Sequence, residues 1–274
     1  MSSRLAVRKT YKLFIGGKFP RSESGRSYLV QDANVALASR KDVRDAVVAA
    51  RAAVKGWSGT TAYNRGQILY RAAEMLEGRR DQFVALGETE AEVDAAIDRW
   101  VWYAGWSDKI AQVHGNANPV AGPYFNISSP EPTGVVGVVA PPESPLLGLV
   151  SVVAPAIVTG NTVVVLAAEG SPLAAVTLAE VLATSDLPGG VVNILTGKVA
   201  ETGPWLAAHM DVNALDLAGV REAELAAALE EAAADNLKRV VRPPAGPVDW
   251  SADPGIGRMT AFLETKTVWH PKGV

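Results

Sequence analysis

Five short apolar runs, each separated from the next by a segment with helical periodicity, constrain the fold of this chain more than any other feature. The runs lie at residues 135–140, 162–166, 191–195, 214–217 and 239–241. Strands that recur about every 25 residues with helices between them are typical of a parallel, doubly wound sheet. The helices between the runs are expected over residues 147–159, 172–183, 200–209 and 221–235. Residues 134–242 are therefore predicted to form an α/β domain with a Rossmann-like sheet.

Helical patterns dominate the residues before this domain. Ser39 followed by Asp42 is typical of a capped helix start, and apolar residues then recur at helical spacing to near Gly56. Further helices are expected over residues 63–76, 81–86 and 93–112. The last of these ranges carries large side chains near one face, which indicates a place in the core rather than a ligand site. These side chains are Trp100, Tyr103, Trp106 and Ile110.

The two ends of the chain have extended character. Gly16 and Gly17 between apolar flanks predict a short hairpin over residues 13–19. Residues 243–257 are dense in proline and glycine and are typical of a linker, whereas residues 259–269 favour a strand because β-prone residues gather near their end. Such a strand exposes unpaired backbone groups unless another strand covers it, so it is expected to contact a partner.

Composition and charge exclude several classes of protein. The chain carries a net charge of −3 and no cysteine, so it lacks a basic footprint for nucleic acid or an anionic membrane and can form neither a disulfide nor a thiolate. Prolines interrupt the apolar stretch 134–165, so no membrane span is expected, and residues 1–14 lack the apolar core of a signal peptide. No metal site is expected, because the three histidines lack ligand spacing. A cytoplasmic protein is predicted. The histidines are His114, His209 and His270.

Several strings, taken in order along the chain, resemble the aldehyde dehydrogenase family. Four of them are Glu131-Pro-Thr-Gly-Val-Val-Gly-Val-Val-Ala-Pro141, Gly160-Asn-Thr-Val-Val164, Leu187-Pro-Gly-Gly-Val-Val-Asn-Ile-Leu-Thr-Gly197 and Asn236-Leu-Lys-Arg-Val240. A fifth, Glu264-Thr-Lys-Thr-Val-Trp269, resembles the C-terminal oligomerisation strand of the family. The resemblance implies a dinucleotide-binding fold with a helical region before it and an extended oligomerisation arm. The chain is most similar to the shortened second module of double-domain aldehyde dehydrogenases.

Departures from the family pattern remove the chemistry that the resemblance implies. Members of the family oxidise an aldehyde through a cysteine thiolate, and this chain has no cysteine. The asparagine that stabilises the oxyanion in the family aligns with Glu143, whose carboxylate would repel a developing negative charge. The general-base glutamate of the family falls near Pro243, which cannot accept a proton. No catalytic residue is therefore predicted.

The positions that the family uses to hold NAD(P) are altered as well. A lysine and a glutamate that grip the adenosine ribose align with Leu166 and Glu169, so only the acid remains. The Phe-Thr-Gly-Ser motif beneath the pyrophosphate aligns with residues 217–220, where Val220 replaces the serine hydroxyl. Glu169 and Gly219 are thus vestigial cofactor positions, and no bound cofactor is expected.

Each of these isolated positions also has a purely structural interpretation, which we favour. Gly137, Gly160 and Gly219 are expected to be turn glycines rather than remnants of a nucleotide site, because an isolated glycine specifies no ligand. Glu169 is expected to cap a helix or face solvent. Glu143 is expected to do the same rather than act as a new general base, because no base-orienting partner accompanies it.

The resemblance implies four regions along the chain. Residues 1–133 hold the hairpin, the helices and the start of the oligomerisation arm, and residues 134–242 hold the dinucleotide-binding-like domain. Residues 243–258 form a linker in place of the catalytic domain of the family, which is expected to be absent, and residues 259–274 form the C-terminal oligomerisation strand.

The sequence predicts a catalytically inactive aldehyde-dehydrogenase-like subunit that acts as a structural or regulatory partner of a full-length aldehyde dehydrogenase, or assembles with itself. The heteromer is favoured, because a chain without the catalytic domain cannot offer a copy of itself the surface that the arm contacts in the family. A weak NAD(P)-binding protein or residual oxidoreductase without cysteine chemistry, and a decayed gene product, remain as alternatives. The expected contact residues are Thr260, Phe262, Glu264, Lys266, Val268 and Trp269.

Overall fold

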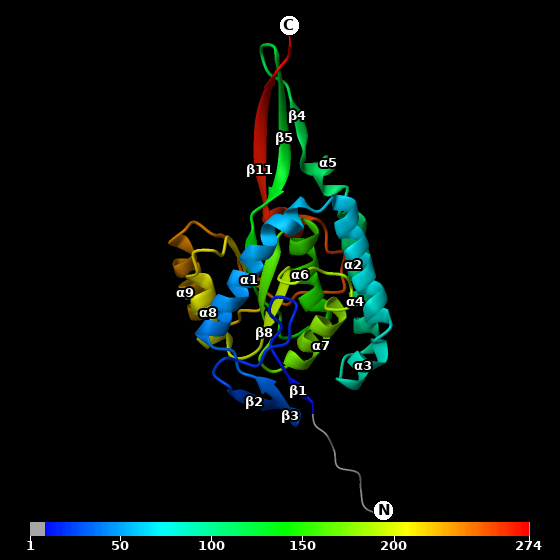
Figure 1. Cartoon of the computed structure of the whole chain (residues 1–274), viewed down its shortest axis with the longest axis vertical. Coiled ribbons are helices and arrows are strands. Elements are labelled where there is room, and N and C mark those ends of the chain that lie inside the picture. The colour runs from blue at the N-terminus through cyan, green and yellow to red at the C-terminus, as the bar shows by residue number, and fades with distance from the viewer. Residues whose placement is uncertain (1–8, 274) are drawn as a thin grey trace, which may run out of the picture.

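A five-stranded parallel sheet forms the centre of the computed structural model, which describes residues 9–273 (Figure 1). The strand order is β10-β9-β6-β7-β8, so the chain runs outward from β6 to β8 and then returns to β9 on the other side of β6. Each predicted apolar run forms one of these strands, and the predicted doubly wound sheet is confirmed. The strands are β6 (Val135–Val139), β7 (Thr162–Leu166), β8 (Val192–Leu195), β9 (Ala214–Asp216) and β10 (Arg239–Val241).

Helices cover both faces of this sheet, because alternate residues of each strand point to opposite sides. Val136 and Val138 of β6 share a hydrophobic cluster with α6 and α7, whereas Val135 and Val139 share another with α1, α8 and α9. All residues of α6 are buried, which explains its uninterrupted apolar sequence. These helices are α1 (Arg40–Gly59), α6 (Leu147–Val158), α7 (Pro172–Leu182), α8 (Val199–Ala207) and α9 (Ala223–Ala234).

Two of the remaining N-terminal helices, α2 and α4, pack beside α6. Two helices replace the single one predicted over residues 93–112, since α4 ends at Trp106 and α5 begins at Ile110. The prediction was wrong because Ser107 N–H bonds to the Ala104 carbonyl in a tighter turn that ends α4. The predicted role of the aromatic stripe is confirmed, since Trp100 and Tyr103 are completely buried in the core. The helices are α2 (Ala62–Glu77), α3 (Arg80–Ala85), α4 (Glu90–Trp106) and α5 (Ile110–His114).

The N-terminal segment forms a small sheet that the sequence pattern did not predict. Its strands are β1 (Thr10–Tyr11), β2 (Ser27–Val30) and β3 (Ala33–Ala36), in the order β1-β3-β2. The expected hairpin reduces to one bridge between Ile15 and Lys18, with φ of 60° at Gly16 and 78° at Gly17. Residues 1–8, which belong to the stretch judged to lack a signal peptide, lie outside the described residues.

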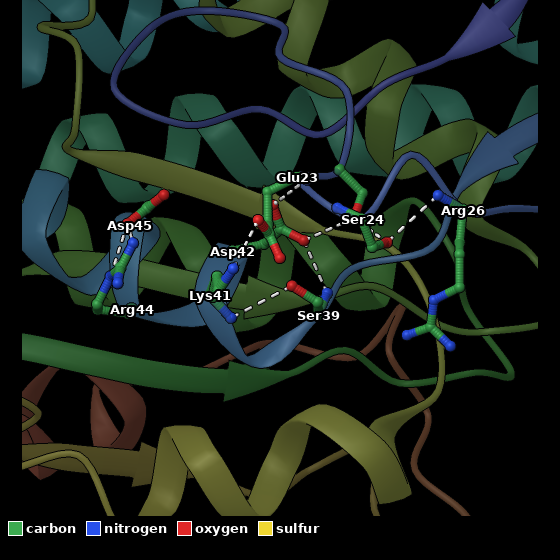
Figure 2. Close-up of polar contacts among 9 residues, drawn as sticks. Glu23, Ser24, Arg26, Ser39, Lys41, Asp42, Arg44 and Asp45 are labelled. Atoms are coloured by element: carbon green, nitrogen blue, oxygen red, sulfur yellow. Dashed lines mark hydrogen bonds and ion pairs between the residues drawn. The ribbon is translucent and has the colours of Figure 1, made fainter.

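The start of α1 is held by a buried carboxylate. Asp42 accepts hydrogen bonds from Ser39 N–H at 2.7 Å, Ser22 Oγ at 2.8 Å and Glu23 N–H at 3.0 Å. Figure 2 shows Asp42 directed at Ser39 and Glu23, whereas Asp45 pairs with the neighbouring Arg44 away from this network. The predicted helix start at Ser39 is therefore confirmed, and Asp42 also ties α1 to the loop before β2.

A three-stranded antiparallel sheet extends away from the body as an arm (Figure 1). It consists of β4 (Asn116–Asn118), β5 (Tyr124–Pro132) and β11 (Leu263–Pro271), with β5 in the middle. β11 pairs with β5 along its whole length, from Leu263 opposite Pro132 to Pro271 opposite Tyr124. One side of the C-terminal strand is thus covered by its own chain.

Two of the expected partner contacts lie outside this strand. Thr260 belongs to α10 (Gly257–Ala261), a short helix that precedes β11. Phe262 is fully buried in the hydrophobic core of its own chain, so the expectation that it contacts a partner was wrong. Burial of the Phe262 side chain stabilises the body instead, and it also fixes the base of the arm, because Phe262 directly precedes β11. Among the helices of residues 9–273, none combines the length and apolar character that a bilayer crossing requires.

We expect Asp42→Ala to lower the free energy of unfolding by about 2–3 kcal/mol, because it leaves buried donors without an acceptor. Urea denaturation measures this loss. The matched control is Asp45→Ala, since Asp45 lies in the same helix but is exposed and pairs with its neighbour Arg44. A loss below about 0.5 kcal/mol is expected for this control. Equal losses in the two variants would contradict the structural role of Asp42.

Candidate functional site

The topological switch point lies between β6 and β9, where the carboxyl ends of parallel strands leave a crevice in folds of this type. Here the crevice is narrow. Gly219 N–H donates a 3.0 Å hydrogen bond to the Val139 carbonyl, and a Cβ at Gly219 would lie 2.1 Å from the Ala140 carbonyl oxygen. Gly219 is therefore required by the close approach of two strand ends.

Gly160 and Gly137, the other two glycines expected in turns, occupy different kinds of position. Gly160 has a φ of 99° between α6 and β7, as a turn glycine does. Gly137 lies within β6, where a Cβ would come within 2.8 Å of Leu215 Cδ2. Its interpretation as a turn glycine was wrong, because dense packing between β6 and its neighbours, rather than backbone curvature, excludes a side chain there.

Glu169 lies apart from Gly219, since β6 separates the strands that precede them. The Glu169 side chain is exposed after β7, and its main-chain carbonyl accepts a 3.4 Å hydrogen bond from the Tyr28 hydroxyl. Burial, aided by the nearby Glu169 carboxylate, raises the pKa of Tyr28 to about 12. The structure thus does not bring the two predicted cofactor positions together.

Leu166 and Val220, which the resemblance in sequence aligns with a lysine and a serine of the family, are both buried hydrophobic residues. Neither can donate a hydrogen bond from its side chain to a ribose or a phosphate. Val220 also lies shortly before the start of α9, and no side chain caps that helix. At these two positions, polar contact with a nucleotide would depend on the backbone.

Glu143 is paired rather than free. Its carboxylate accepts a 3.0 Å hydrogen bond from Trp250 Nε1 and forms an ion pair with Arg221. Partial burial opposes ionisation, but the hydrogen bonds from Trp250 and Arg221 outweigh it and hold the pKa of Glu143 below its usual value. A carboxylate with a lowered pKa is a weak proton acceptor near neutral pH, so these contacts favour the structural interpretation of Glu143.

Residues 243–258, which we call the strap, fold onto this end of the sheet. Trp250 of the strap is 7% exposed. Arg99 of α4 donates hydrogen bonds to the Trp250 carbonyl at 2.7 Å and the Ala252 carbonyl at 2.9 Å. The strap therefore packs against the body at the place where the sequence predicted a linker.

A buried ion pair fixes the end of the strap. Arg258 pairs with Asp216, which is the last residue of β9 and is fully buried. Burial raises the pKa of Asp216, whereas Arg258 and the Ala218 N–H stabilise its charged form. The Arg258 guanidinium also lies 5.3 Å from the centre of the Trp250 ring. Asp216, Arg258 and Trp250 were missed from the sequence, although an aspartate inside an apolar run requires a buried partner.

A cavity of about 770 Å³ lies between α9 and the first part of the strap. Its walls are alanines of α9 and prolines of the strap, and ion pairs of Arg221 with Glu143 and of Arg242 with Glu230 flank it. An apolar cavity of this size can bind a small molecule. Its lining contains no serine, threonine, histidine or lysine side chain that could act as nucleophile or base.

Histidine side chains do not gather at this site. His209 follows α8, and His270 lies in β11 on the arm. Within residues 9–273, no three acidic, histidine or cysteine side chains are arranged to hold a metal ion.

We expect Arg258→Met to lower the free energy of unfolding by about 3–5 kcal/mol, because the buried Asp216 carboxylate loses its counter-charge. The double variant Asp216→Asn with Arg258→Met should regain most of this loss, since it leaves no uncompensated charge. Urea denaturation of the three proteins measures both effects. A double variant no more stable than Arg258→Met would show that the ion pair does not secure the strap.

Comparisons with known proteins agree with this architecture. Residues 30–243 match the model of the "Aldehyde dehydrogenase family". "Aldehyde dehydrogenase, cytosolic 1" of Elephantulus edwardii is 34% identical over 84% of this chain and 49% of its own length. The NAD+ complex of aldehyde dehydrogenase from Bacillus cereus superposes with a TM-score of 0.79 at 27% identity, over 85% of this chain and 50% of that one.

A third relative has the same extent of similarity. HpcC from Thermus thermophilus superposes with a TM-score of 0.79 at 33% identity, over 85% of this chain and 47% of that one. This chain therefore spans about half the length of the relatives that it matches. The family-model match, the shared sequence and the shared sheet lead to one conclusion: the chain belongs to the aldehyde dehydrogenase family.

Proposed function

We propose that this chain is a catalytically inactive subunit of the aldehyde dehydrogenase family that serves as a structural or regulatory partner of a full-length aldehyde dehydrogenase. The single observation that carries the proposal is the complete lack of cysteine in the sequence. The oxidation that the resemblance implies forms a covalent bond between a cysteine sulfur and the aldehyde carbon, and the cavity lining offers no serine, threonine, histidine or lysine side chain in its place.

The surroundings of the switch point support inactivity. Glu143 is held by Trp250 of the strap and by Arg221 beside the cavity, and the strap residues that line the cavity include three prolines. A general base must reach the proton that it abstracts and must compete for it near the working pH. The paired and acidic Glu143 meets the second condition poorly.

The same geometry argues against tight NAD(P) binding. The buried Leu166 and Val220 provide no polar side-chain contact, and Gly219 closes on Ala140 at the switch point. The chain offers a nucleotide backbone groups and the exposed Glu169, while Arg221 and Arg242 beside the cavity are already paired with Glu143 and Glu230. We therefore infer that this subunit works without a bound nucleotide, although the Bacillus cereus relative was solved with NAD+.

The arm supplies the contact surface of the proposal. Phe125, Ile127, Val268 and Trp269 are large apolar side chains of the arm, and all are exposed. β11 also has one edge free of pairing within residues 9–273. Exposed apolar side chains beside an open edge favour pairing with a strand of another subunit. The cytosolic relative supports placing this assembly in the cytoplasm.

We expect the chain, isolated from its own cells, to copurify with a full-length aldehyde dehydrogenase, and native mass spectrometry to give a heteromeric mass. Ile127→Glu should reduce the recovery of the larger subunit, because it puts a charge on the apolar surface of the arm. Met210→Glu is the matched control, since Met210 is an exposed apolar residue on the body. Recovery of this chain alone, in one copy or two, would contradict the heteromeric role.

A second candidate function is weak NAD(P) binding, which the 770 Å³ cavity and the uncapped start of α9 favour. Calorimetric titration of the purified chain with NAD and NADP separates it from the proposal. We expect no heat of binding at about millimolar ligand, because the polar side-chain contacts are replaced. Saturable heat that Glu169→Gln weakens would favour the nucleotide-binding function instead.

A further inference from the structure

The outer edge of β11 is the longest open strand edge of the arm. β11 lies at one side of the sheet order β11-β5-β4, and β5 covers only its inner edge. Eight of its nine residues, Glu264 to Pro271, are exposed. Natural proteins cover, shorten or bend such an edge, because its free N–H and C=O groups pair readily with another strand.

Two hydrogen bonds at the ends of β11 fix which residues face outward. Lys272 N–H donates to the Pro123 carbonyl, and Thr133 N–H donates to the Phe262 carbonyl. In an antiparallel pair, every second residue directs its backbone groups at the partner strand. The even-numbered residues from 262 to 272 therefore bond to β5, and Thr265, Thr267 and Trp269 direct their backbone groups outward.

We propose that, in the absence of a full-length relative, two copies of this chain pair through the outer edges of β11, antiparallel and centred on Thr267. Thr267 then faces Thr267 of the second copy, and Thr265 faces Trp269. These are the residues with outward backbone groups, so each facing pair can exchange two hydrogen bonds. The two arms become one continuous sheet. The inference rests on the docking role proposed above for the arm.

Side chains favour this register over its neighbours. Centring on Thr267 places Glu264 beside His270 and Lys266 beside Val268 of the other copy, so no like charges face each other. Centring on Trp269 would place Lys266 opposite Lys272. Centring on Thr265 would place Glu264 opposite Lys266, but the pairing would end at residues 263 and 267, because Phe262 is buried in the body.

Self-pairing of this kind needs no catalytic domain. Both copies use the outer edge of β11, and a two-fold symmetric contact requires the same surface on each subunit. A strand from a full-length relative would compete for this edge. Without the relative, the chain then forms a dimer through the two arms. The dimer dissociates when the relative is present.

The lack of cysteine makes the register directly testable, because each introduced thiol is unique. Facing residues lie about 4.5–5.5 Å apart between Cα atoms, within the range of a disulfide. We expect purified Thr267→Cys to oxidise to a covalent dimer. Glu264→Cys alone and His270→Cys alone should stay monomeric on denaturing gels, because their like positions are about 20 Å apart. A mixture of the two should give the mixed dimer.

A second measurement tests the proposal without introduced thiols. Thr267→Pro removes the outward N–H at the centre of the pairing but leaves the bonds to β5 intact, so sedimentation equilibrium should give the mass of one chain. Thr267→Val keeps the N–H and should give the mass of two. A wild-type chain that is monomeric throughout a concentration series, or a dimer that Thr267→Pro leaves unchanged, would overturn the proposal. Neither result bears on copurification with a full-length relative.

Discussion

The ion pair between Asp216 and Arg258 connects the central sheet to the strap and the base of the arm. Asp216 ends β9 beside the switch point of the sheet, and Arg258 begins the path from the strap into the arm. A fully buried carboxylate is unfavourable unless a counter-charge accompanies it, so the sheet requires the strap to be in place. Trp250 and Arg99 then fix the middle of the strap on the same end of the sheet. The position of α10, and with it the base of β11, follows from these contacts.

This arrangement explains how a chain that spans about half the length of its relatives keeps a closed core. Trp250 of the strap, Met259 of α10 and Phe262, which follows α10, fill the hydrophobic cluster around α6. Their burial stabilises the body by about 2 kcal/mol for each large side chain. The strap is therefore part of the folded unit and cannot be treated as a passive connection between β10 and the arm.

Sequence patterns predicted the central sheet, because the signal for each strand is local and repeats along the chain. They failed where structure depends on distant contacts. The strands of the β1-β3-β2 sheet are too short to show a period, and the division between α4 and α5 lies in a polar turn at Ser107. The sequence pattern places Trp250 in a linker, because its partners Glu143 and Arg99 lie far away in the sequence. The sequence thus predicted which side chains of the family pattern are replaced at the candidate site. It did not predict that the strap packs over this site.

The order in which the arm is assembled has a consequence for biosynthesis. β5 leaves the ribosome long before β11, because the whole parallel sheet and the strap lie between them in the sequence. During that interval β5 has only the three-residue β4 beside it, and Phe125 and Ile127 face the crowded cell. A nascent chain with an uncovered strand edge is prone to aggregate, so slow or interrupted translation after residue 132 is a vulnerable stage in making this protein.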